Sequence, residues 1–391
     1  WSRRFIMSQI NIRNLSNEND DGSPEIVGVS TFSATSFFVP PKGSTADRPS
    51  DCEPGSIRFN TDTANLEYFR GKTIGWSQFE LVTPNLGGGT GSNTGLGTRG
   101  LFTGGNNGST YDDIEFITIS TLGNTQDFGN LAAVTLGSGN GASRTRGVIG
   151  GGQQPSGFHD KIDFVTIPSL GNATDFGNLT SARDFLGGLS SQIRGLFFGG
   201  RNPSAVNIID FITIAQTGNA VDFGDLLSTR KNYPMGAASS TRGLMAASTP
   251  APGTKEIDFV TIMTTGNGQD FGDTTAIQGG AGASNSTRAI FAGGYVVPAK
   301  TNTIEFATIA TLGNSQDFGD LTSARRGLGG AASPTRACFA GGQTSEDVNT
   351  IDFIEIATLG NAADFGDLTL ASSSNGKKKN VSGCSNGHGG L

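Results

Sequence analysis

The sequence is poor in cysteine, histidine and tryptophan, and each shortage excludes a class of fold or site. It has three cysteines, two histidines and two tryptophans in 391 residues. Three scattered thiols build no disulfide framework, and no cysteine or histidine spacing fits a zinc site. The histidines, His159 and His388, lie far apart and complete neither a Ser-His-Asp arrangement nor a two-histidine metal site. We therefore expect no catalytic, metal-binding or cofactor-binding residues.

Long apolar runs and excess positive charge are also missing. No run approaches the roughly 18 apolar residues that a membrane-spanning helix needs, so we expect no membrane insertion. The net charge is −7, which argues against a general nucleic-acid or anionic-membrane binder. The first residues lack the apolar region of a secretory signal. The biological start stays open between Trp1 and Met7.

What the sequence does contain is an internal repeat. The phrase Asp-Phe-Gly occurs six times at intervals of 47 or 48 residues, opening at Asp127, Asp175, Asp222, Asp270, Asp317 and Asp364. An Ile-Asp/Glu-Phe phrase keeps the same register at residues 114–116, 162–164, 209–211, 257–259, 304–306 and 351–353. A third marker is an arginine before a short apolar run, at Arg99, Arg146, Arg194, Arg242, Arg288 and Arg336. A period near 47 residues lies between the lengths of WD40 and kelch propeller blades.

Each repeat has the pattern of four short strands. Residues 303–309 alternate apolar and polar side chains and include β-branched residues, which is typical of a half-buried strand. Residues 336–342 form an apolar run that ends in a glycine pair, and residues 328–333 are small enough for a crowded innermost strand. No helix-length periodicity occurs. The sequence therefore predicts an all-β fold with a six-bladed kelch-like propeller, which leaves only short sheet edges.

The repeated phrases favour structural roles. Asp-Phe-Gly is a magnesium-binding phrase in protein kinases, but no ATP loop or catalytic loop accompanies it here. We expect its Asp to cap a turn and its Gly to take positive φ. The six arginines and six aspartates are candidates for repeated hydrogen bonding within or between blades, with a ligand ring at the axis as the alternative.

The two ends of the repeat region carry the same glycine-rich pattern, near residues 87–98 and 377–388. We expect one terminal copy to complete a blade begun at the opposite end. Lys377, Lys378 and Lys379 align with Arg325-Arg326, which predicts an exposed turn, and His388 aligns with the arginine marker, which also predicts a turn. The loops that vary most between repeats are residues 152–160, 201–207, 248–255, 295–301 and 343–349.

The chain before the repeats divides into two parts. Residues 1–50 are polar and irregular, which predicts an extended arm that becomes ordered against a partner. Residues 51–83 read as a β-hairpin module, and residues 84–391 as the propeller. Two strands alone are marginal in water, so the module needs other copies or a neighbouring surface. The predicted assembly residues are Ile57, Phe59, Leu66, Tyr68, Phe69, Trp76 and Phe79.

Two stretches resemble known families. The Gly-Ser-Ile-Arg-Phe-Asn-Thr-Asp-Thr phrase at residues 55–63, with Leu-Glu-Tyr-Phe at 66–69 and Trp76, resembles a hairpin module of bacteriophage tail fibres and other virion appendages. The blade phrases Thr-Arg-Gly-Leu-Phe and Gly-Asn-x-x-Asp-Phe-Gly-Asp-Leu resemble kelch-like repeats of virion structural proteins, especially those of cyanobacterial phages. Together these resemblances cover residues 51–391. They imply a protein located in the virion and assembled in the host cytoplasm.

The function expected from this resemblance is structural and not enzymatic. The N-terminal region would attach to other virion proteins, with a homo-oligomer expected, and the propeller would be displayed towards a host-surface glycan or protein. A tail fibre or appendage is favoured, and a capsid or neck decoration protein is an alternative. A glycan-binding lectin propeller is another, although it calls for exposed Trp or Tyr and this region has few. A six-bladed sialidase would need Ser-x-Asp-x-Gly-x-Thr-Trp motifs, and the chain has no Trp after residue 76.

Overall fold

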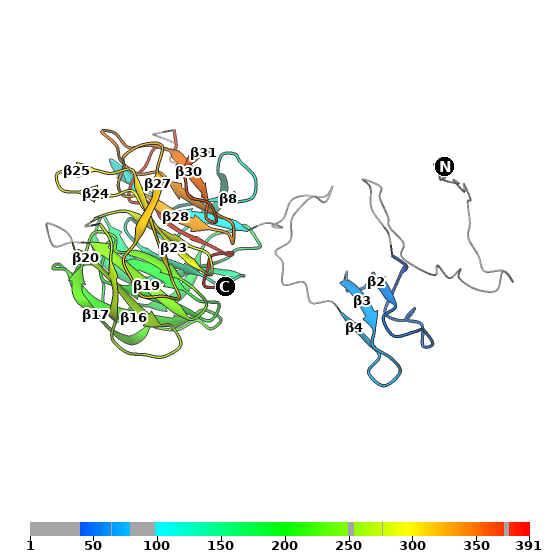
Figure 1. The fold of residues 1–391 in the computed structure, drawn as a ribbon. Coiled ribbons are helices and arrows are strands. Elements are labelled where there is room, and N and C mark those ends of the chain that lie inside the picture. Colours follow the sequence, from blue (N-terminus) through cyan, green and yellow to red (C-terminus); the bar gives the residue numbers. More distant parts are fainter. Residues whose placement is uncertain (1–39, 64, 79–97, 249–253, 276, 371–374) are drawn as a thin grey trace, which may run out of the picture. The chain divides into compact units, whose positions relative to one another are not determined.

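The computed structural model describes residues 40–78 and 98–391, except for positions 64, 249–253, 276 and 371–374. All regular structure in these residues is β-strand, which confirms the predicted all-β class. No helix suited to crossing a membrane occurs among them. The chain divides into two compact units, Trp1–Val82 and Thr83–Leu391 (Figure 1). The boundary predicted at residues 83–84 and the assembly residue Phe79 lie outside the described residues.

The smaller unit is one four-stranded sheet in the order β1-β2-β3-β4. The central pair β2 and β3 is the hairpin expected from the sequence, and β1 pairs with β2 in parallel. The sheet therefore also includes residues from the segment predicted to be an extended arm. Its strands are β1 (Lys42–Gly43), β2 (Ile57–Asn60), β3 (Asn65–Phe69) and β4 (Trp76–Gln78).

The larger unit contains six four-stranded antiparallel sheets in its described residues. Sheet 1 consists of β32 (Ser382–Ser385), β5 (Arg99–Thr103), β8 (Asp113–Thr118) and β9 (Gln126–Asn130). Sheet 2 consists of β10 (Gly139–Ala142), β11 (Arg146–Gln154), β12 (Gly157–Thr166) and β13 (Thr174–Asn178). Sheet 3 consists of β14 (Gly187–Ser190), β15 (Arg194–Phe198), β16 (Val206–Thr213) and β17 (Val221–Arg230).

The remaining three sheets follow the same order. Sheet 4 consists of β18 (Met235–Ala238), β19 (Arg242–Ser248), β20 (Thr254–Thr261) and β21 (Gln269–Asp273). Sheet 5 consists of β22 (Ala281–Ser284), β23 (Arg288–Ala292), β26 (Thr303–Thr308) and β27 (Gln316–Asp320). Sheet 6 consists of β28 (Gly329–Ala332), β29 (Arg336–Ala340), β30 (Thr350–Glu355) and β31 (Ala363–Asp367). Two short hairpins, β6 (Asn106–Asn107) with β7 (Ser109–Thr110) and β24 (Tyr295–Val296) with β25 (Ala299–Lys300), lie in loops.

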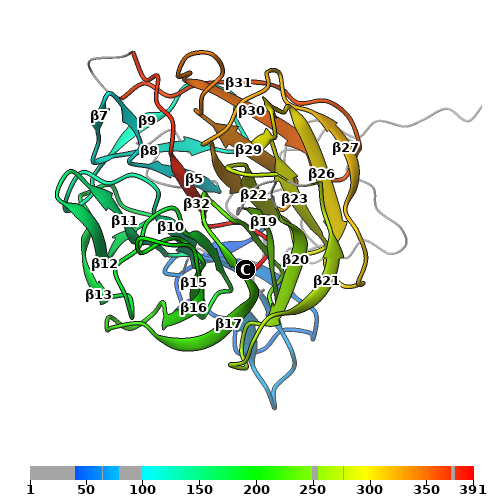
Figure 2. The same cartoon turned by 90° about the vertical axis from the view of Figure 1, so that its left-hand side faces the viewer.

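The first strands of the six sheets contact one another in a cycle. β10 contacts β14, and the contacts continue through β18, β22, β28 and β32 back to β10. In Figure 2, β10, β22 and β32 lie near the centre, whereas β13, β21, β27 and β31 lie at the periphery. Sheet 1 combines β32 from the end of the chain with β5, β8 and β9 from the start of the repeats. This pairing confirms the prediction that a terminal copy completes a sheet begun at the opposite end.

Glycine lets the first strands approach closely. A Cβ atom on Gly236 would lie 2.1 Å from the carbonyl oxygen of Gly188, and one on Gly282 would lie 2.1 Å from that of Gly236. Only a residue without a side chain fits at such a distance. The larger apolar side chains form six buried clusters, each drawn from two neighbouring sheets, including sheets 6 and 1. The hydrophobic core therefore lies between the sheets.

The Asp-Phe-Gly phrases lie in the fourth strands, so the expectation that their Asp caps a turn is wrong. The aspartates are exposed, and each phenylalanine is buried. The Phe128 ring meets Phe116 of the neighbouring strand edge-on, with centroids 6.0 Å apart. The glycine does take positive φ, +143° at Gly129, beside a β-bulge. The Asn of the Gly-Asn step instead bonds to the preceding sheet, since Asn172 Oδ1 accepts the Asn130 N–H at 3.0 Å.

Candidate functional site

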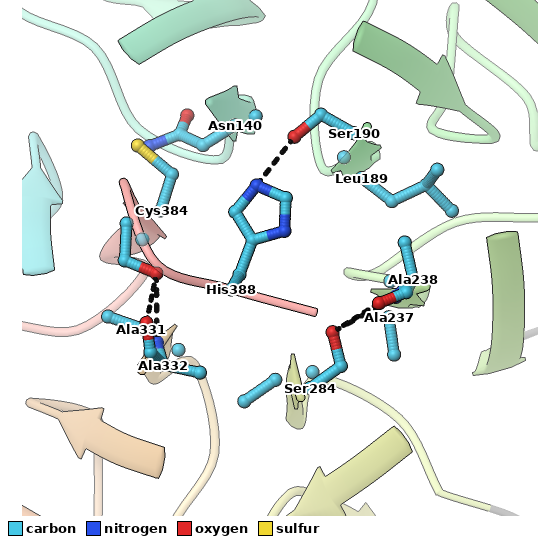
Figure 3. Close-up of a pocket in the computed structure, with 18 of the residues that line it drawn as sticks. Asn140, Leu189, Ser190, Ala237, Ala238, Ser284, Ala331, Ala332, Cys384 and His388 are labelled. Atoms are coloured by element: carbon cyan, nitrogen blue, oxygen red, sulfur yellow. Dashed lines mark hydrogen bonds between the residues drawn. The ribbon is translucent and has the colours of Figure 1, made fainter. Parts of the chain in front are cut away.

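The first strands surround a small cavity, which we call the axial cavity. Glycine, alanine and serine from all six sheets line it, and His388 projects into it (Figure 3). Its volume is about 50 Å³. Pockets that hold drug-sized ligands measure roughly 300–1,000 Å³. The axial cavity therefore has room for water-sized guests and not for a sugar or a nucleotide.

Serine side chains connect neighbouring first strands around this cavity in three pairs. Ser190 Oγ accepts the Ala142 N–H and donates to the Ala142 carbonyl, both at 2.8 Å. Ser284 makes the same two bonds to Ala238, and Ser385 makes them to Ala332. Because each hydroxyl both donates and accepts within the protein, these serines satisfy backbone groups between sheets. Their arrangement is that of structural side chains.

His388 belongs to a segment, residues 386–391, that lies against the axial cavity. Its Nε2 lies 2.9 Å from the Ala142 carbonyl oxygen and 3.1 Å from Ser190 Oγ. Its Nδ1 accepts the Gly390 N–H at 3.0 Å. The proton therefore sits on Nε2, and the ring is neutral. Burial lowers the pKa of His388 to about 4, in agreement with this neutral form.

The pairing of Ser190 with His388 is not that of a nucleophile with its general base. A base must accept the serine proton, but His388 Nε2 already donates to the Ala142 carbonyl. The other ring nitrogen receives a backbone N–H where a catalytic triad places a carboxylate. The sequence predicted a turn role for His388. Turns and a bend at residues 386–390 confirm this prediction, and the His388 side chain is half-buried beside the first strands.

The six marker arginines connect each sheet to the next. Each Nη1 donates to a backbone carbonyl at the end of the third strand of the following sheet, over 2.6–3.4 Å. The bonds run from Arg99 to Ile167, Arg146 to Ile214, Arg194 to Ile262, Arg242 to Ile309, Arg288 to Ile356 and Arg336 to Ile119. Each guanidinium also lies 4.4–4.9 Å from a phenylalanine ring centre of its own sheet.

The marker aspartates have no part in these contacts. Asp127, Asp175, Asp222, Asp270, Asp317 and Asp364 are exposed on the fourth strands. Among the described residues, no ion pair joins one of them to a marker arginine. Charged side chains on an edge strand discourage pairing with another chain, which is a sufficient role for them.

A second set of contacts between sheets consists of buried ion pairs. Lys378 Nζ lies 2.7 Å from Glu115 Oε2, and both side chains are fully buried. The prediction that Lys378 lies in an exposed turn is therefore wrong. Equivalent pairs join Arg183 to Asp210, Arg230 to Asp258 and Arg325 to Asp352. At the boundary of sheets 1 and 2, Thr135 stands where these cations stand, and Asp163 Oδ1 is buried without a hydrogen-bond partner.

The predicted assembly residues of the smaller sheet fall on two faces. Ile57 pairs with Tyr68 and Phe59 with Leu66, so these four share one face. Ile57 is 50% and Leu66 37% exposed. Phe69 is buried on the opposite face, where its ring centre lies 5.4 Å from that of Trp76.

The covered face of this sheet is mostly polar. Glu67 is fully buried, forms an ion pair with Arg48 and accepts the Asn60 amide at 2.6 Å. Arg58 is also buried and donates to the Ser44 carbonyl at 2.9 Å. The sheet thus buries polar groups inside the unit and leaves aliphatic side chains outside. This is the reverse of the usual distribution in a soluble sheet.

Two features of the larger unit were missed by the sequence interpretation. One is the contact of His388 with the axial cavity, for which the local sequence carried no signal. The other is an aromatic group formed by Phe158, Phe185 and Tyr233, which come from separate repeats. Its signal was present, because Phe185 and Tyr233 align with glycine in other repeats.

Comparison with known proteins does not assign the chain to a family. A scan against protein-family models finds no match, and a search of curated proteins finds none either.

Proposed function

We propose that this chain is a non-enzymatic structural protein of a phage virion, a tail fibre or appendage component. In this proposal residues 84–391 form a six-bladed kelch-like β-propeller, and the N-terminal region attaches the chain to other virion proteins or to further copies of itself. The propeller is displayed outward, where its loops meet the host surface.

Four observations support the six-bladed propeller. The first strands contact one another in a cycle, the core clusters include one between sheets 6 and 1, and β32 pairs with β5. The arginine bonds follow the same cycle, since Arg336 of sheet 6 reaches the Ile119 carbonyl of sheet 1 at 3.4 Å. A contact from the last sheet to the first is what a closed ring requires.

The observation that carries the attachment role is the exposed aliphatic face of the smaller sheet. Ile57 and Leu66 project from this face while Glu67 and Arg58 are buried on the other. Exposed apolar side chains that share one face of a small sheet are typical of an interaction surface. The smaller unit is therefore suited to assembly.

The non-enzymatic role is supported by the polar groups of the axial cavity. Its serines and its histidine are committed to hydrogen bonds with the backbone. The hydrogen-bond directions leave none of them as an activated nucleophile.

The test is peptide mass spectrometry of phage particles purified by density gradient, combined with gold-labelled antibodies raised against residues 98–391. We expect peptides from both units in the particle fraction and label on a tail or other appendage. Recovery of the chain only from the soluble lysate, with none in the particles, would contradict the proposal.

A further inference from the structure

One position in the larger unit is repeated with the same backbone conformation and different side chains. Two residues before each first strand, φ is positive in all six repeats. The residues are Gly137 (+69°), Phe185 (+50°), Tyr233 (+61°), Gly279 (+67°), Gly327 (+70°) and Asn380 (+57°). This left-handed region suits glycine and tolerates asparagine, whereas an aromatic side chain is strained there.

The two strained residues occupy neighbouring repeats and contact each other. The ring centres of Phe185 and Tyr233 lie 4.7 Å apart at an interplanar angle of 65°. The Tyr233 N–H donates to the Phe185 carbonyl at 3.0 Å. Strained backbone of this kind persists where surrounding contacts fix it, and it concentrates at binding sites. Because glycine serves at three equivalent positions, the fold itself does not require these aromatic side chains.

An arginine completes the group. Arg201 Nε and Nη2 bind the two carboxylate oxygens of Asp184 at 2.8 and 3.0 Å. The same guanidinium lies 4.8 Å from the ring centre of Phe185 and 5.7 Å from that of Phe158. Arg201 therefore lies near two aromatic rings, and its charge is balanced by a buried carboxylate. Among the described ion pairs, no other repeat pairs the residues that stand at the positions of Asp184 and Arg201.

The group remains open to solvent in part. Phe158, Phe185 and Tyr233 are each half-buried, and the Arg201 side chain is 32% exposed. The Tyr233 hydroxyl is buried without a hydrogen-bond partner among the described contacts. Tyr233 also lines the depression at this end of the first strands, opposite the end where His388 lies. These features describe a shallow aromatic surface with one fixed polar pair.

We propose that Phe158, Phe185, Tyr233 and Arg201 form a binding site for a neutral carbohydrate. The C–H groups on one face of a pyranose ring carry partial positive charge and pack on the negative faces of aromatic rings. Sugar hydroxyl oxygens accept hydrogen bonds, and the Arg201 N–H groups that Asp184 does not bind can donate to them. An anionic ligand would call for an uncompensated cation, and a cationic ligand for a free carboxylate, whereas this pair carries no net charge.

This inference rests on the proposed display of the propeller at the host surface, and it names the class of partner. The two can nevertheless fail separately. Mass spectrometry of particles reports where the protein is located, whereas a glycan array reports what the purified chain binds.

The experiment applies the full-length protein to an array of neutral and acidic bacterial oligosaccharides. We expect binding to neutral hexose-containing glycans and at least a tenfold loss in Phe185→Gly and Arg201→Met. Phe185→Gly is informative because glycine is the natural residue at three equivalent positions, so the variant should fold with a melting temperature close to that of the wild type.

The matched control is Asn380→Gly, which removes the strain of the same positive φ at a repeat that lacks the aromatic group. Its glycan binding should equal that of the wild type. The proposal is overturned if the wild-type protein binds no glycan, binds only acidic glycans, or binds neutral glycans as well after Phe185→Gly as before.

Discussion

His388 is a neutral, half-buried imidazole beside the axial cavity, and this makes stability depend on pH. Burial lowers its pKa in the folded protein to about 4, against an ordinary value of 6.5. Between these values the unfolded chain binds more protons, so the free energy of unfolding rises with pH. The contribution is fully present above about pH 6.5 and is lost as pH falls towards 4.

We predict that lowering the pH from 7.5 to 5 costs the wild type about 2 kcal/mol more than it costs His388→Gln. Urea unfolding of both proteins at the two pH values measures the difference. Because His159 and the carboxylates titrate in both proteins, their contributions cancel in the comparison. Equal pH dependence would show that His388 is not buried as a neutral ring.

Lys378 provides a second prediction at the residue scale. Its ammonium group lies beside the Glu115 carboxylate, and both side chains are buried away from water. Removing one partner of a buried ion pair leaves an uncompensated charge and costs roughly 3–5 kcal/mol. We expect Lys378→Met to destabilise the protein by this amount in urea unfolding.

The double variant Lys378→Met with Glu115→Gln should recover much of that loss. The glutamine removes the charge and keeps an oxygen for the Thr125 hydroxyl and the Thr369 and Leu370 N–H groups. If the double variant is as unstable as the single one, the ion pair is not the source of the effect.

At the scale of sheets and strands, the arginine contacts test whether the six sheets close into a ring. Arg336 reaches carbonyls of sheet 1, at the opposite end of the repeats, as Arg194 reaches sheet 4. We predict that Arg336→Met and Arg194→Met lower the free energy of unfolding by similar amounts, about 1–2 kcal/mol each. A neutral Arg336→Met beside a destabilising Arg194→Met would mean that sheets 6 and 1 do not meet in solution.

The positions of many strands were predictable from the sequence, because the side-chain pattern of a strand is local. The alternation in residues 303–309 and the apolar run at 336–342 correspond to β26 and β29. The role of Asp317 was not predictable, because turn chemistry and edge-strand chemistry favour the same residue types. Whether Asp317 lies in a turn or in an edge strand is decided by the strand with which its segment pairs.

The interpretation of Lys378 failed for a related reason. Its carboxylate partner, Glu115, lies far away in the sequence, in the first repeat. The local pattern of three lysines therefore predicted a solvent-exposed turn. The contact of His388 was not predictable for the same reason, since the Ala142 carbonyl that accepts its Nε2–H belongs to a distant strand. Contacts between the ends of the chain are visible only once the sheets are assembled.

At the scale of the whole molecule, β32 joins the end of the chain to the start of the repeats. It pairs with β5 along its length and contacts the first strands of sheets 2 and 6. We predict that ending the chain after Asn380 lowers the melting temperature by more than about 10 °C and broadens the transition. An unchanged sharp transition in circular dichroism would contradict a ring closed by β32.

The exposed face of the smaller sheet bears on how copies assemble. Its aliphatic side chains, Ile57 and Leu66, can be replaced by charged residues without disturbing the buried Glu67 on the other face or the ion pair of Glu67 with Arg48. Such a change alters the assembly surface and leaves the larger unit intact. It therefore separates attachment from the stability of the six sheets.

The most direct test of the account is the molar mass in solution, measured by light scattering on the full-length chain and on its Ile57→Glu, Leu66→Glu double variant. The account predicts a multimer for the wild type and a monomer with an unchanged melting transition for the variant. A wild-type monomer, or a multimer that the two charges leave intact, would contradict assembly through this face.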